Sequence, residues 1–246
     1  MTTFLRWCHR TGAITHDPSA RLSDPDSPLR TYRRTYGKVQ AKHPGRWLTH
    51  AQAYEQLVGA CQDHSTVGLR DELVIRLGLL GLRCSEIAGL QIGNLRQLPT
   101  ITWTGKGHKP RKATAGPALV ALIDRYFAAY TDHAPADPLI CCEVLGAARR
   151  GGTHRINWHQ PAAARTIFQI VKTRAARAGL GHVAPHDLRR TAAGILHTAT
   201  TENGAHHFDL LDIQRVLGHS DPATTMRSYL EPMDTDVLDR ASSVLD

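Results

Sequence analysis

His186-Asp187-Leu188-Arg189 is followed along the chain by Leu217-Gly218-His219 and then by Tyr229, and this order says most about the fold and the site. His186 and Arg189 stand three positions apart, so they share one face if the segment is helical. Two basic groups on one helix face, a histidine that follows a glycine and a late tyrosine together predict a polar site built by several helices.

The segment that leads to the tyrosine is predicted to be helical. Apolar residues recur at helical spacing from 210 to 217, and Gly218 is typical of a residue that ends a helix. Asp221 is a good N-cap residue and Pro222 suits the first helical position, which places Tyr229 about two turns into a further helix. The short connection would aim the tyrosine toward the preceding histidine.

These residue types suit an attack on phosphorus by a tyrosine hydroxyl. The hydroxyl has an ordinary pKa of about 10, so it needs proton removal and a cationic cradle for the charge that builds on phosphorus. An arginine fork matches two phosphate oxygens, and a histidine can donate one further bond or move a proton near neutral pH. Taken singly, each residue has a structural alternative: a capping or core histidine, a salt-bridged arginine or a core aromatic. The joint order favours the chemistry.

Three further motifs stand earlier in the chain, and the whole set resembles one family. The six motifs are Trp47-Leu48-Thr49, Gly81-Leu82-Arg83-Cys84-Ser85-Glu86-Ile87, Gly105-Lys106-Gly107, His186-Asp187-Leu188-Arg189-Arg190-Thr191, Leu217-Gly218-His219-Ser220 and Thr224-Thr225-Met226-Arg227-Ser228-Tyr229. Over residues 47–232 they are similar to the catalytic domain of the tyrosine recombinase, or phage integrase, family. The resemblance implies a mainly α-helical domain with a small antiparallel β-sheet, an α+β fold.

The resemblance also implies a nucleophile and the groups that assist it. In the family a tyrosine attacks the scissile phosphate of DNA and forms a 3′-phosphotyrosyl link, which implies Tyr229 as the nucleophile here. Arg83, Arg189 and His219 would stabilise the pentacoordinate phosphorus. Because the link stores the bond energy, no cofactor is expected.

Lys106 and His186 complete the expected catalytic set. Lys106 stands between two glycines at the tip of a predicted hairpin, where a flexible ammonium can protonate the departing 5′ oxygen; Lys109 is the alternative acid. His186 is expected to assist proton transfer or to orient the phosphate. Glu86, three residues after Arg83, is expected to support that arginine by a hydrogen bond, although simple helix-surface pairing explains it almost as well.

The charge of the chain favours a polyanionic partner. The net charge is +8 and the isoelectric point is near 9.5, which suits double-stranded DNA, with an anionic membrane surface as the competing explanation. The expected phosphate contacts are Lys109, Arg111, Lys112 and Arg190. No apolar run is long enough to span a bilayer, and the N-terminus lacks the apolar stretch of a signal peptide, so no membrane partner and a cytoplasmic location are expected.

Neither disulfides nor a metal site is expected. The five cysteines are odd in number and show no CxxC pairing, which indicates reduced thiols. His206-His207 lacks cysteine or carboxylate partners at the spacing of metal ligands. The chemistry inferred above needs no metal.

Three segments are expected along the chain. Residues 1–46 resemble the last helix of the family's core-binding domain plus a linker, so most of that domain is expected to be missing. Three explanations for the missing part are open: the chain is a truncated product, it is a fragment, or it is a protein that clamps DNA by one face only. Residues 47–232 form the catalytic domain, and residues 233–246 form a tail that is a candidate for exchange between protomers or for packing on its own domain. The family's synaptic assembly implies a homotetramer.

The apolar pattern places the elements of the catalytic domain. Thr49 and Gln52 form a capping box that starts a helix. Further helices are predicted over residues 69–80, 119–127 and 161–178, and the one expected hairpin pairs residues 101–104 with 113–115. Compared with the family pattern, the segment between Arg189 and His219 contains several extra residues at about 200–208, which are expected to form a surface loop. The basic residues Arg165, Lys172, Arg174 and Arg177 are expected on a solvated helix face, with DNA contact as the alternative.

The favoured function is a site-specific recombinase or integrase, with a mobile element as the first choice of context. A type IB topoisomerase uses similar residues but relaxes supercoils without exchanging partners. A DNA-binding remnant or regulator without turnover is the alternative that is not an enzyme.

Overall fold

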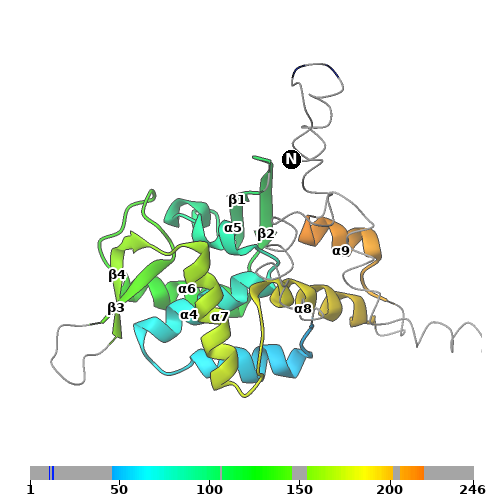
Figure 1. Cartoon of the computed structure of the whole chain (residues 1–246), viewed down its shortest axis with the longest axis horizontal. Helices are drawn as coiled ribbons and strands as arrows, with labels where there is room; N and C mark the ends of the chain where they lie inside the picture. Colours follow the sequence, from blue (N-terminus) through cyan, green and yellow to red (C-terminus); the bar gives the residue numbers. More distant parts are fainter. Residues whose placement is uncertain are drawn as a thin grey trace, which may run out of the picture. The chain divides into compact units, whose positions relative to one another are not determined.

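The computed structural model describes residues 46–105, 107–145, 154–201 and 206–218, together with residues 11 and 13. The chain divides into two units, Met1–Pro44 and Gly45–Asp246, and the helices and strands of the described residues lie in the second unit. Its elements, drawn in Figure 1, are η1 (Gln52–Val58), η2 (Gly59–Cys61), α4 (Thr66–Leu79), α5 (Cys84–Ala88), η3 (Ile92–Leu95), β1 (Thr100–Thr104), β2 (Pro110–Thr114), α6 (Pro117–Ala129), β3 (Cys141–Leu145), β4 (His154–Pro161), α7 (Ala164–Arg177), α8 (Pro185–Thr198) and α9 (Leu210–Leu217).

The helix predicted at Thr49 is present and has the predicted cap. The Thr49 amide donates to Gln52 Oε1 at 3.1 Å, and the Gln52 amide donates back to Thr49 Oγ1 at 3.2 Å. The helix winds as a π-helix over Gln52–Val58 and ends as a 3₁₀ turn. A capping box fixes where a helix begins but not which of these windings follows.

Helix α4 is the centre of the core, as the apolar run predicted. Leu73, Val74, Ile75 and Leu77 are wholly buried, and the helix packs against α6, α7 and α8. Ser65 caps its first turn by accepting a hydrogen bond from the Gly68 amide. None of the helices in the described part of the chain is long and apolar enough to cross a membrane.

The described part of the chain contains two antiparallel strand pairs where the sequence predicted one. Strands β1 and β2 pair as an antiparallel hairpin, but β2 already begins at Pro110, so Arg111 and Lys112 lie in a strand. Strands β3 and β4 form a second antiparallel hairpin that the sequence analysis missed, at the end of the domain away from α9 (Figure 1). Strand β4 reads mostly polar, and such a strand gives little alternation of apolar and polar residues to detect.

The prediction of a helix from residue 161 was also wrong at its start. Pro161 is the last residue of β4, and α7 begins at Ala164. The Ala162 amide donates to the Ile140 carbonyl at 2.8 Å, which holds this segment against β3. A tertiary hydrogen bond therefore sets the start of the helix.

Arg174 lies in the core, whereas the sequence analysis expected it on a solvated face. Its Nε donates to Asp71 Oδ2 at 2.7 Å, and its Nη1 donates to Asp63 Oδ2 at 2.9 Å and to the Ala60 carbonyl at 2.8 Å. Arg70 Nε donates to the other oxygen of Asp71 at 2.8 Å. One buried carboxylate thus joins two buried guanidinium groups and ties α4 to α7.

Replacing Arg174 by Met is expected to lower the free energy of unfolding by about 3–5 kcal/mol, because it leaves a buried carboxylate with half of its partners. Arg177→Met is the matched control, since this side chain is 60% exposed and lies 3.9 Å from Asp63. Its expected cost is below about 1 kcal/mol. Urea unfolding of both variants measures the free energy of unfolding. Equal decreases in the two variants would show that the buried network contributes no more to stability than the exposed ion pair.

Candidate active site

Arg83 stands at the N-cap of α5, where Glu86 holds it from two directions. The backbone amide of Arg83 donates to Glu86 Oε2 at 2.8 Å, and its Nη1 donates to Glu86 Oε1 at 2.9 Å. The hydrogen bond predicted between these two residues is therefore present. The Glu86 side chain is 4% exposed and that of Arg83 is 33% exposed. A buried carboxylate thus fixes a guanidinium that still reaches the surface.

Helix α8 presents His186 and Arg189 one turn apart, as the sequence predicted. The helix begins at Pro185, whose fixed φ and missing amide suit the first helical position. It packs so closely on α4 that a Cβ at Gly78 would lie only 2.6 Å from Leu188 Cδ1. On another side the Leu48 amide donates to Thr191 Oγ1 at 2.9 Å. These contacts hold rigidly the helix that bears the candidate residues.

The end of α9 is where the motifs of this site meet. Arg189 is 1% exposed, and its Nη2 donates to the Leu217 carbonyl at 2.8 Å. Arg111 Nη1 donates to the same carbonyl at 2.8 Å, and its Nη2 donates to the Val216 carbonyl at 2.7 Å. The last carbonyls of a helix lack partners within the helix and carry negative charge, so they attract cations. Gly218 ends the helix in the left-handed region, with φ of 61°, as predicted.

The charges of the site act on one another. Partial burial lowers the pKa of His186, the Arg190, Arg189 and Arg83 charges lower it further, and Asp187 opposes them. Burial likewise lowers the pKa of Arg111; Glu86 opposes this and Arg83 adds to it. Arg111 of the β1–β2 hairpin and His186 of α8 therefore both lie close enough to Arg83 for its charge to shift their pKa values.

The imidazole of His186 is expected to titrate below 6.5, its ordinary pKa. The native state then binds fewer protons than the unfolded state, so this residue's contribution to stability is present above about pH 6.5 and is lost as the pH falls. Replacing Arg190 by Gln should raise the pKa, because it removes a positive neighbour. NMR titration of the imidazole measures the His186 pKa in the wild type and in Arg190→Gln. Arg215→Gln is the control, because the Arg215 side chain is exposed on α9. A His186 pKa at or above 6.5 would contradict this.

Some of the remaining expected residues lie in the described part of the chain and others do not. Lys109 and Lys112 are exposed on the hairpin, and Arg190 Nη1 donates to Asp187 Oδ1 at 3.2 Å. The candidates Lys106, His219 and Tyr229 lie outside the described residues, as do residues 1–10, 14–45 and 233–246 and the centre of the extra loop, 202–205. Thr200 and His206 form a bridge at the base of that loop.

Sequence reasoning missed the docking of Arg111 on α9. In β2, Arg111 and Ala113 are less exposed than Pro110 and Lys112, and they share a face of the hairpin with their cross-strand partners Trp103 and Ile101. This alternation of burial is seen in the structure and not in the residue types of the strand. A basic residue on the covered face of a strand needs acceptors. The acceptors themselves lie more than one hundred residues away and leave no local signal.

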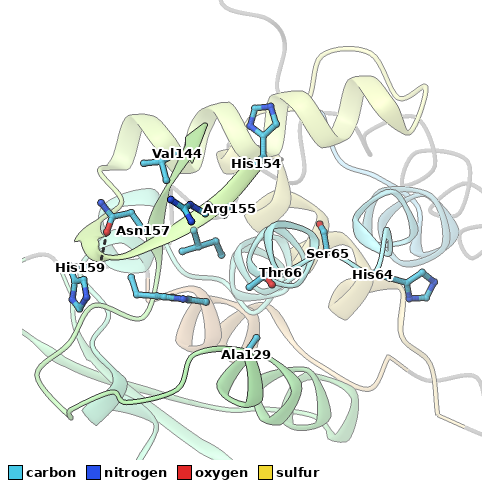
Figure 2. A pocket seen from close by; sticks show the side chains of 11 residues that line it. His64, Ser65, Thr66, Ala129, Val144, His154, Arg155, Asn157 and His159 are labelled. Carbon is cyan, nitrogen blue, oxygen red and sulfur yellow. Dashed lines mark hydrogen bonds between the residues drawn. The ribbon is translucent and has the colours of Figure 1, made fainter. Parts of the chain in front are cut away.

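A cavity lies away from this site. It has a volume of about 780 Å³ and is lined from β4 and from the start of α4. Figure 2 shows that the imidazoles of His64, His154 and His159 stand apart around it. Among the described residues, no group of three or more histidine, cysteine or carboxylate side chains is placed to hold a metal ion.

Curated proteins of known name are similar to this chain in sequence. The chain is 31% identical over 227 residues to the tyrosine recombinase XerD of Neisseria meningitidis serogroup B, a match that covers 89% of this chain and 65% of that protein. It is 34% identical over 233 residues to the tyrosine recombinase XerC of Mycobacterium sp. (strain KMS), covering 91% and 66%. The chain therefore spans about two thirds of the length of these relatives.

Solved structures show the same fold at lower identity. The XerA recombinase is 22% identical with a TM-score of 0.57, covering 79% of this chain and 65% of that one. The XerH site-specific recombinase, bound to a palindromic difH substrate after cleavage, is 18% identical with a TM-score of 0.58, covering 82% and 54%. The predicted mainly helical fold with small antiparallel sheets is confirmed. The model of the phage integrase family matches residues 46–235, and the chain belongs to that family.

Proposed function

We propose that this protein is a site-specific DNA recombinase that cleaves and rejoins strands through a 3′-phosphotyrosyl intermediate. The observation that carries the proposal is the meeting of Arg189 and the hairpin residue Arg111 at the end of α9. Both donate to the Leu217 carbonyl, and Arg83 lies close enough to Arg111 for its charge to lower the pKa of Arg111. His219 follows two residues later in the chain. Two relatives that are 31% and 34% identical to this chain are named tyrosine recombinases.

The proposed reaction exchanges one phosphodiester for another. The Tyr229 oxygen forms a bond to the scissile phosphorus, and the bond from phosphorus to the 5′ oxygen breaks. The tyrosine proton passes to a base, for which His186 and His219 are the candidates, and Lys106 gives a proton to the departing oxygen. Attack by a 5′ hydroxyl of a partner duplex reverses these steps. No external energy source is required.

The described residues supply positive charge for this reaction. Arg83 is oriented by Glu86, and Arg189 is anchored at the end of α9. Donors that are fixed before the reaction stabilise charge on phosphorus without having to reorganise. The lowered pKa of His186 favours the neutral imidazole, which suits a group that accepts a proton or donates one hydrogen bond.

Contacts to the DNA backbone are proposed for Lys109, Lys112 and Arg190. The two lysines are exposed, and the net charge of +8 favours a phosphate-rich partner. A homotetramer at synapsis, with exchange of residues 233–246 between protomers, and a role in movement of a mobile element complete the proposal.

The proposal is tested with nicked duplexes and then with plasmids. A pool of nicked duplexes traps the covalent product, because the short 5′ fragment diffuses away, and sequencing of the trapped DNA identifies the site. Plasmids with one or two copies of that site then separate the outcomes. Recombination that requires two sites supports the proposal, relaxation of a one-site plasmid indicates a topoisomerase, and binding without any adduct indicates a protein without turnover.

A further inference from the structure

Arg111 connects two parts of the site that are far apart in sequence. It lies in β2 opposite Trp103, and its guanidinium carbon is 5.3 Å from the centre of the indole ring. Its two terminal nitrogens donate to the carbonyls of Val216 and Leu217. One planar fork therefore caps the last turn of α9 while its stem belongs to the hairpin.

The backbone around Arg111 is shaped to admit it. A Cβ at Gly105 would lie 2.8 Å from Arg111 Cδ, and a Cβ at Gly218 would lie 2.2 Å from Arg111 Cζ. Gly105 directly precedes Lys106, and Gly218 directly precedes His219. The space at both places is thus taken by the same side chain.

We propose that Arg111 is a positioning residue, which fixes the hairpin that carries Lys106 to the end of α9. This inference rests on the proposed function, in which Lys106 is the general acid. A two-stranded hairpin is marginally stable by itself, so its direction depends on what it is tied to. The two hydrogen bonds to helix carbonyls supply that tie and keep the tip of the hairpin in register with the turn before His219.

The alternative for Arg111 is a phosphate contact, as expected from its basic loop. Two of its nitrogens are committed to carbonyls, which disfavours that role. The two roles differ in what they change. Loss of a phosphate contact weakens DNA binding and lowers the salt slope by about 0.9. Loss of a positioning contact slows cleavage of DNA that is already bound.

The test is Arg111→Lys, which keeps the charge but replaces the fork with a point donor. Single-turnover cleavage is measured at saturating protein on two nicked duplexes, one ordinary and one with sulfur in place of the bridging 5′ oxygen. A thiolate leaves without protonation, so the sulfur substrate does not need Lys106. On the ordinary duplex we expect a rate at least about tenfold below the wild type, since small misplacements of catalytic groups cost up to about 10²-fold. On the sulfur duplex most of this loss should disappear, with affinity and salt slope unchanged.

Two variants accompany this experiment. Lys112→Gln shows the loss of affinity and slope that removal of a neighbouring phosphate contact causes. Gly105→Ala crowds Arg111 without changing any charge, and it should reproduce the selective loss on the ordinary duplex. If Arg111→Lys does not fold, a wild-type rate of Gly105→Ala on the ordinary duplex would overturn the positioning role.

The outcomes separate the inference from the proposed function. An equal loss on both duplexes, an unchanged rate, or a loss confined to affinity and slope would each overturn the positioning role. A wild-type protein that forms no adduct on either duplex would instead overturn the proposed function.

Discussion

Tyr229→Phe is expected to abolish the covalent protein–DNA adduct while DNA affinity stays nearly unchanged. The substitution removes the only oxygen that the proposed reaction uses as a nucleophile, and it leaves the basic surface intact. A denaturing gel of the wild type and the variant on the same nicked duplex measures the adduct, and a binding titration measures affinity. An adduct that persists in Tyr229→Phe would show that this tyrosine is not the nucleophile.

The tyrosines in the described part of the chain are poor rivals for physical reasons. Burial raises the pKa of Tyr130 to about 12, and its hydroxyl donates to the Trp158 carbonyl at 3.0 Å. Burial also raises the pKa of Tyr126, which donates to the Leu139 carbonyl, and that of Tyr54. Tyr54→Phe is therefore the matched control, and it should form the adduct as the wild type does.

Arg189→Lys is expected to slow cleavage of bound DNA by about 10²- to 10³-fold, the usual cost of losing one electrostatic donor at a transition state. The lysine keeps the charge but cannot both hold the Leu217 carbonyl and present a planar fork to phosphate. Single-turnover cleavage at saturating protein measures the rate.

Arg215→Gln is the control for this prediction. Its side chain is 78% exposed on α9 and pairs only with Asp212 among the described ion pairs, so its removal should leave the rate unchanged. Because Arg189 is buried, urea unfolding of Arg189→Lys must show a folded protein under the assay conditions. A folded Arg189→Lys that cleaves at the wild-type rate would exclude a role for this arginine at phosphorus.

Local signals predicted the parts of the fold that depend on neighbouring residues. The capping box of Thr49 and Gln52, the left-handed end of α9 at Gly218 and the Arg83–Glu86 pair involve residues at most a few positions apart. Interactions of this range can be recognised by spacing alone. The family motifs then indicated which of these local features belong to one site.

Features that depend on distant partners escaped prediction. Arg174 is buried because Asp71, 103 residues earlier, accepts its hydrogen bond. A signal for this network exists in hindsight, since Arg70 and Asp71 interrupt the apolar run of α4 and need partners there. The β3–β4 hairpin and the docking of Arg111 on α9 are likewise tertiary contacts that leave little trace in local sequence.

The most direct test of the central claim is to identify the residue that becomes linked to DNA. The wild-type protein is trapped on its nicked duplex, digested with trypsin and nuclease, and sequenced by mass spectrometry. The account predicts a nucleotide joined through its 3′ phosphate to Tyr229, in the tryptic peptide that runs from Ser228 to Arg240. A link to any other residue, or a link through a 5′ phosphate, would contradict it.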